Sequence, residues 1–114
     1  MLMLSTKVIQ RILYHALKGK VLILTPKAEQ AERIRLEIKS YVKSVMSKSI
    51  SVYDNAEGLH IGGFEYVYVM TADKWNEAAY RLKFGGLVLV TDPTIQPKFI
   101  EDGNAVKRLP VSEG

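Results

Sequence analysis

The sequence predicts an α/β fold, a three-layer sandwich around a small, mostly parallel four-stranded sheet. Two short runs, residues 21–24 and 87–90, are aliphatic at every position, which is typical of strands covered on both faces. Between such runs lie segments whose apolar residues recur with a helical period. Alternation of strands and helices favours a sheet whose strands run parallel, with helices on its faces.

The first half of the chain contains two predicted helices and two predicted strands. Residues 5–18 form a helix that Ser5 or Thr6 can cap and that Gly19 ends. After a strand at residues 20–25, Thr25 and Pro26 have the residue types that begin a helix, which we expect over residues 26–48. A second strand is expected at residues 49–54. The glycine-rich segment 55–64 is expected to be a loop long enough for a parallel return to the next strand, with a hairpin as the alternative.

The second half repeats the alternation and then loses it. Residues 65–71 form a strand rich in β-branched and aromatic residues. A helix over residues 72–84, capped by Thr71 or Asp73, is expected to bury Trp75, Ala78, Ala79 and Leu82. The fourth strand covers residues 87–92. Residues 93–114 form an irregular tail with at most one short strand around residues 105–109, and the 114 residues are expected to form a single domain, 1–114.

Composition limits the functional classes. The absence of cysteine excludes disulfides, thiolate metal sites and cysteine nucleophiles. With no signal peptide recognisable and no apolar run long enough for a membrane span, we expect an intracellular, cytoplasmic protein without membrane contact. The net charge of +4 favours a polyanionic partner such as DNA or RNA, or serves solubility alone.

Polar residues follow all four predicted strands. They are Thr25-Pro26-Lys27, Asp54-Asn55, Thr71-Ala72-Asp73 and residues 91–94, which include Asp92. Ligands of open parallel sheets bind beyond the carboxyl ends of the strands, so we expect a polar rim there. The alternative is that these residues only cap helices and form turns.

Other candidate residues carry weaker signals. His15 and His60 are expected to have solvated or packing roles, and no catalytic constellation or phosphate-cradling loop is recognisable. Tyr66 and Tyr68 share a strand face and could stack bases if exposed, although burial against a helix is the favoured interpretation. Arg33, Arg35, Lys39 and Lys43 are expected on the solvent side of the second helix.

The segment "LTPKAEQAERI", followed by "GGFEYVYVMTADKWNEAAY" and "LVLVTDP", resembles the first RecA-like domain of superfamily 2 helicases. The resemblance covers residues 5–93 and implies a RecA-like half-domain. It also implies nucleic-acid backbone contacts at Thr25, Pro26, Lys27, Thr71 and Ala72. Small cysteine-free chains rich in Lys, Ile, Val and Tyr are in addition similar in style to uncharacterised proteins of rod-shaped viruses of hot-acid archaea.

The departures from the helicase pattern exclude carrying over an ATPase activity. The phosphate loop is absent and the Asp-Glu pair is reduced to Asp92-Pro93. ATP hydrolysis needs both the loop and the magnesium-binding carboxylates, so we expect no cofactor and no ATPase.

Three functional hypotheses follow. The first is a non-catalytic nucleic-acid-binding domain that holds phosphates with strand-end hydroxyls, helix N-termini and Lys27, with Asp92 on the same rim. The second is a protein-interaction module or homodimer assembled through a sheet edge, which we expect at residues 87–92 unless the tail covers it. The third is a magnesium enzyme that uses Asp54, Asp73 and Asp92.

Overall fold

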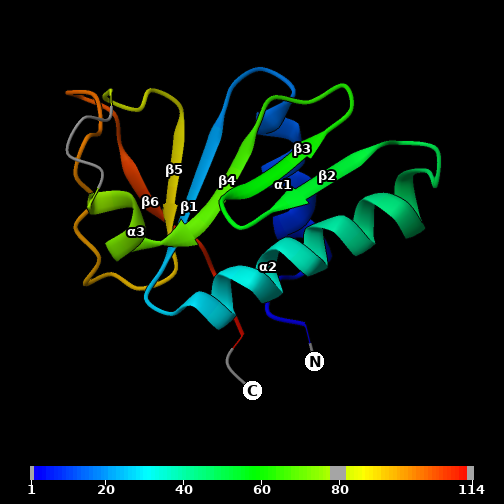
Figure 1. Ribbon diagram of the computed structural model, residues 1–114, viewed down its shortest axis with the longest axis horizontal. Helices are drawn as coiled ribbons and strands as arrows, with labels where there is room; N and C mark the ends of the chain where they lie inside the picture. Colours follow the sequence, from blue (N-terminus) through cyan, green and yellow to red (C-terminus); the bar gives the residue numbers. More distant parts are fainter. Residues whose placement is uncertain (1, 78–81, 113–114) are drawn as a thin grey trace.

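A computed structural model of the chain describes residues 2–77 and 82–112 and shows an α/β fold (Figure 1). Six strands form one mixed sheet in the order β2-β3-β4-β1-β5-β6. Along the chain the elements are α1 (Thr6–Ala16), β1 (Val21–Thr25), α2 (Ala28–Tyr41), the π-helical turn η1 (Val42–Met46), β2 (Val52–Asn55), β3 (Gly58–Ile61), β4 (Val67–Thr71), α3 (Ala72–Asn76), β5 (Leu87–Val90) and β6 (Val106–Arg108).

The sheet is larger and less parallel than the sequence predicted. Strand β1 pairs in parallel with β4 and β5, and β5 pairs in parallel with β6. Strand β3 is antiparallel to both of its neighbours. It lies in the segment expected to be a loop, where Leu59 and Ile61 turn inward and His60 outward. The alternative, a hairpin between the strands on either side of this segment, is also wrong, because β3 lies between β2 and β4 and these two strands point the same way. The short strand in the tail is confirmed.

Helices begin and end where local chemistry allows. The Ser5 hydroxyl accepts a hydrogen bond from the Val8 amide at 3.2 Å and caps α1, as expected. Helix α2 starts later than predicted, with Lys27 in the capping position, because Thr25 still belongs to β1 and pairs with Thr71. The π-helical turn η1 continues α2 toward the predicted end of that helix.

The helix after β4 is shorter than predicted in the described part of the chain. Thr71 is its cap, and its Oγ1 accepts a hydrogen bond from the Lys74 amide at 3.1 Å. Trp75 is buried as expected, but Leu82 is 88% exposed, so its predicted burial is wrong. The predicted burial of Ala78 and Ala79 lies outside the described residues.

Two apolar clusters lie on opposite faces of the sheet. The larger one packs α1 and α2 against residues such as Val21, Ile23 and Val69. The smaller one packs Trp75 and the segment around residues 95–100 against the other side of β1 and β5. The Trp75 indole Nε1 donates to the Lys98 carbonyl at 2.7 Å and ties α3 to that segment.

A buried carboxylate holds the N-terminal segment on α2. Glu37 is buried, and its two carboxylate oxygens accept hydrogen bonds from the amides of Met3 and Leu4 at 2.9 and 2.8 Å. The tail reaches the same place, because the Ser112 amide donates to the Met3 carbonyl. The first and last described segments of the chain therefore meet beside α2, below the sheet in Figure 1.

Candidate nucleic-acid interface

The predicted polar rim exists. Strands β1, β4 and β5 run in parallel, and β2 points the same way because two antiparallel pairings separate it from β4. The carboxyl ends of these strands, at Thr25, Asn55, Thr71 and Asp92, thus lie along one edge of the sheet. The antiparallel β3 interrupts the rim with the turn that leads into it.

Most of the rim hydroxyls are already used within the fold. Thr25 is 0% exposed, and its hydroxyl donates to the Lys27 carbonyl at 2.8 Å. The Thr71 hydroxyl accepts the capping hydrogen bond of α3, and Ala72 is the first residue of that helix. These contacts match the alternative interpretation that the threonines serve helix starts. The Thr25 hydroxyl is therefore not free to hold a phosphate, whereas the Thr71 hydroxyl only accepts and keeps its O–H donor.

Lys27 and Asp92 do meet in one place. Together with Pro26 they line a strand-end hollow of about 660 Å³, whose other walls include Glu29, Arg33 and Ser112. The hollow mixes acidic and basic side chains, and the tail forms one of its walls. Thr71 and Ala72 are not among its lining residues. The predicted site residues therefore divide into two groups.

Asp92 has a structural role in its turn. Its Oδ1 accepts hydrogen bonds from the Thr94 hydroxyl at 2.7 Å and from the Thr94 amide at 2.8 Å. These two hydrogen bonds hold the pKa of the Asp92 carboxyl below its ordinary value of 3.8, and the bond from the Thr94 hydroxyl has the larger effect. Asp92 stays ionised and repels a phosphate, which argues against it as a direct phosphate contact.

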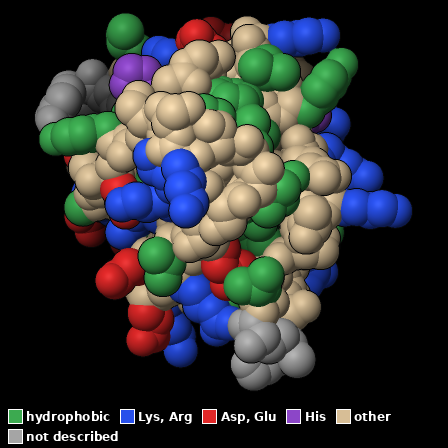
Figure 2. Space-filling view, turned by 90° about the vertical axis from the view of Figure 1, so that its right-hand side faces the viewer, with side chains coloured by type: hydrophobic (Ala, Val, Ile, Leu, Met, Phe, Trp, Pro, Cys, Tyr) green, Lys and Arg blue, Asp and Glu red, His purple; other side chains and the backbone are tan. Residues whose placement is uncertain are grey.

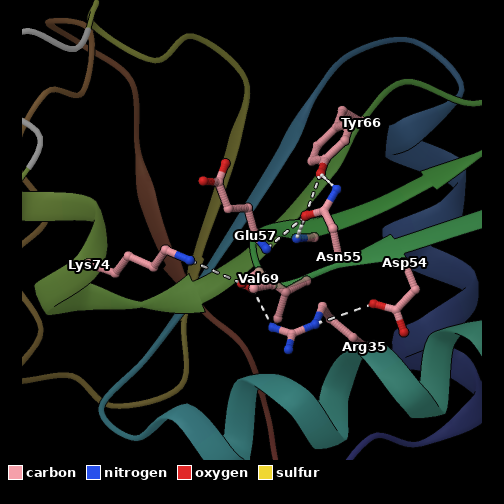
Figure 3. A network of polar contacts seen from close by, with 9 residues as sticks. Arg35, Asp54, Asn55, Glu57, Tyr66, Val69 and Lys74 are labelled. Carbon is pink, nitrogen blue, oxygen red and sulfur yellow. Dashed lines mark hydrogen bonds and ion pairs between the residues drawn. The ribbon is translucent and has the colours of Figure 1, made fainter.

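Of the basic residues expected on a solvated face of the second helix, Arg33 is exposed, whereas Arg35, Lys39 and Lys43 are half-buried. The Arg35 side chain is only 13% exposed and lies 3.6 Å from the Asp54 carboxylate (Figure 3). Its Nη1 donates at 2.9 Å to the Val69 carbonyl, which points past the end of β3. Arg33 pairs with Glu37, and the Lys43 ammonium donates to the Ile50 carbonyl. At the end of the molecule shown in Figure 2, basic side chains are interspersed with hydrophobic ones.

A row of aromatic side chains lies on the sheet face opposite α1 and α2; sequence reasoning placed Tyr66 and Tyr68 on one face but missed that Tyr53 and His60 extend the row. Tyr53 and His60 are directly opposite each other on β2 and β3. The His60 and Tyr66 rings lie 6.2 Å apart, and the Tyr66 and Tyr68 rings lie 4.4 Å apart. We call these four residues the aromatic face. Tyr53 is 69% exposed, His60 is exposed, and the other two are half-buried.

The turn between β2 and β3 holds the aromatic face in place. The Asn55 Oδ1 accepts hydrogen bonds from the amides of Glu57 and Gly58, and the Asn55 side chain also bonds the Tyr66 hydroxyl at 2.8 Å (Figure 3). Burial raises the pKa of the Tyr66 phenol above 10.0, against the opposing effect of the Asn55 hydrogen bond. The Tyr66 ring therefore stays neutral and oriented at physiological pH.

The aromatic face continues into a hollow of about 430 Å³. Its aromatic walls are Tyr68, Trp75 and Phe84, whose rings meet edge to face. Two lysines, Lys20 and Lys83, also line it. The arrangement combines flat apolar rings with nearby cations, the two components that bind single-stranded nucleic acid.

A metal centre has no support in the described residues. Within 2–77 and 82–112, no three acidic or histidine side chains gather as a metal ion requires. The hypothesis of a magnesium site built from Asp54, Asp73 and Asp92 is therefore wrong. His15 and His60 lie on different elements, α1 and β3. In the same part of the chain, no helix has the length and apolar character to cross a membrane.

Comparisons with protein-family models, with curated proteins and with solved structures found no match to this chain. The resemblances to superfamily 2 helicases and to archaeal viral proteins stay predictions.

Proposed function

We propose that this protein binds single-stranded nucleic acid without catalysis, with bases stacked on the aromatic face and phosphates near the surrounding lysines. The observation that carries the proposal is the row Tyr53–His60–Tyr66–Tyr68 on a sheet half that faces away from α1 and α2. Bases stack on any exposed flat ring, so such a row binds without reading sequence.

The ring geometry suits successive bases. Neighbouring strands bring Tyr53 and His60 opposite each other, and residues two apart on one strand bring Tyr66 and Tyr68 to the same side. The side chains come from a sheet, a rigid support that lowers the entropic cost of binding. Tyr53 is the most exposed of the four and is the ring most available to a base.

Lysine side chains around the aromatic face supply a weak attraction for the phosphates of a nucleic-acid strand. Lys20 and Lys83 lie at the hollow, and Lys74 lies beside the turn, with its ammonium 3.5 Å from the Ala56 carbonyl. Lys83 is paired with the almost fully exposed Asp102, at 3.6 Å. Three phosphate contacts give a salt slope of about −2 for a single strand, so affinity falls about 15-fold between 50 and 200 mM salt. The exposed Lys27 at the rim can add to this attraction.

The test is fluorescence anisotropy of labelled single-stranded DNA and RNA at 50 and 200 mM salt, with wild type, Tyr53→Ser and Tyr14→Ser. Loss of a stacked base costs about 1–3 kcal/mol, so Tyr53→Ser should weaken binding by about 5- to 150-fold. Tyr14 is similarly exposed, at 59%, but lies on α1 on the other side of the sheet, so its variant is the matched control. Absence of binding at micromolar protein and low salt, or equal effects of the two variants, would refute the proposal.

Self-association through a sheet edge is the second candidate. The expected edge at β5 is covered by β6, so the edges of the sheet are β2 and β6. Strand β2 has the sequence VYDN, without the lysine or proline that commonly blocks edge pairing. Light scattering between 10 and 500 μM protein tests this candidate, and a monomer mass throughout would exclude it.

A further inference from the structure

We infer that a basic pocket between α1 and the β5–β6 edge binds a small phosphomonoester that carries a compact apolar group. The pocket lies on the sheet face that packs against α1, whereas the aromatic face lies on the opposite side. The inference therefore stands independently of nucleic-acid binding.

The polar groups of the pocket are all basic in the described part of the chain. Arg11 and His15 come from successive turns of α1, and Lys107 and Arg108 come from β6. Lys107 is paired with Leu89, whose side chain packs in the cluster under α1, so the alternation of strand side chains directs Lys107 to the pocket side. Arg108 is one position further along β6, so its side chain projects to the other face of the sheet. Its positive charge helps to lower the pKa of the Asp92 carboxyl.

Two of these cations, Arg11 and Lys107, lack an acidic partner in the described part of the chain. Helix α1, with the sequence TKVIQRILYHA, contains no acidic residue, and Lys7 precedes Arg11 by four positions. Like charges at this spacing repel each other and destabilise a helix. An anion bound between α1 and β6 would relieve this repulsion.

The charge and shape of the pocket select the ligand class. Two permanent cations, Arg11 and Lys107, match the two negative charges of a phosphomonoester near neutral pH, and an arginine fork suits phosphate oxygens. The His15 imidazole can contribute one more hydrogen bond. The floor consists of aliphatic side chains, Val8, Ile12, Leu87 and Leu89. The volume is about 160 Å³, close to that of protein cavities that hold benzene.

The probe that combines both features is phenyl phosphate. Titration into ¹⁵N-labelled full-length protein at pH 7.5 and fixed salt should shift amide resonances of α1 and β6, saturably and with a Kd of about 1 mM or tighter. Inorganic phosphate lacks the apolar group and phenol lacks the charge, so each should bind at least about 10-fold more weakly. If inorganic phosphate or phenol binds as tightly as phenyl phosphate, the ligand class is wrong.

Charge-neutralising variants locate the site. Arg11→Gln and Lys107→Gln should each weaken phenyl phosphate binding by about 10-fold or more. Lys18→Gln is the matched control, because Lys18 has the same charge near the end of α1 but lies over the Tyr14 ring and not in the pocket. These side chains are exposed, and an unchanged thermal melt confirms that each variant folds. No saturable shift up to 20 mM phenyl phosphate, or equal weakening by all three variants, would overturn the inference.

Discussion

The N-terminal segment should depend on Glu37 for its attachment, and replacing this one residue should destabilise the whole protein. The Glu37 side chain is only 5% exposed and accepts hydrogen bonds from two backbone amides and from the Arg33 Nε at 3.1 Å. Glu37→Ala removes both acceptor oxygens and all three hydrogen bonds. It leaves the amides of the buried residues Met3 and Leu4 without their carboxylate partner.

The expected magnitude follows from those amides. A buried donor without a partner costs about 1–3 kcal/mol, so two of them give about 3 kcal/mol at the lower half of that range. The Arg33 contribution is small, because its side chain is 43% exposed and solvent screens the pair. Glu37→Gln keeps one acceptor oxygen and should cost about half as much.

Urea unfolding measures this change. At an m-value of about 1.5 kcal/mol/M, Glu37→Ala should lower the midpoint by about 2 M. Glu32→Ala, an exposed change on the same helix, is the control and should stay within about 0.5 kcal/mol of wild type. Amide hydrogen exchange at Met3 and Leu4 should accelerate in Glu37→Ala alone. If the two alanine variants unfold at the same urea concentration, the carboxylate does not hold the segment and the reasoning is wrong.

Three further predictions concern the supports of the candidate sites. Arg35→Ala leaves the Val69 carbonyl without its donor and should cost about 2 kcal/mol in urea unfolding; a loss under about 0.5 kcal/mol would contradict the bridging role. Gly58→Ala places a Cβ against the Val67 carbonyl oxygen and should destabilise the β2–β3 hairpin by about 2 kcal/mol or more, measured by thermal melting. Asp92 should titrate below 3.8 in carboxyl ¹³C NMR, and Thr94→Ala should raise that pKa toward 3.8. Because the pKa of Asp92 is lowered by folding, its contribution to stability is present above about pH 4 and lost as pH falls through the folded-state pKa; an unchanged pKa in Thr94→Ala would show that another group sets it.

The sequence by itself determined the elements whose apolar pattern is continuous. Residues 21–24 and 87–90 are aliphatic at every position, so burial on both faces is the only arrangement that removes them from water, and both segments became central strands. Local chemistry also sufficed for caps, since Ser5 and Thr71 each act on an amide three residues away. The common direction of β1, β4 and β5 follows the predicted parallel arrangement, whereas β2 shares it through the unpredicted β3.

Only the tertiary structure decided the roles of short segments and of isolated polar side chains. Strand β3 has only four residues, too few for the alternation of Leu59, His60 and Ile61 to predict a strand. Its pairing with β2 and β4 makes it one. That pairing also placed His60 beside Tyr53 and Tyr66, which are distant in sequence. Arg35 became a bridge because β4 runs past the end of β3 and leaves the Val69 carbonyl open. Periodicity reports which face of an element avoids water, whereas the partner of a polar side chain depends on strand order, which long-range packing selects.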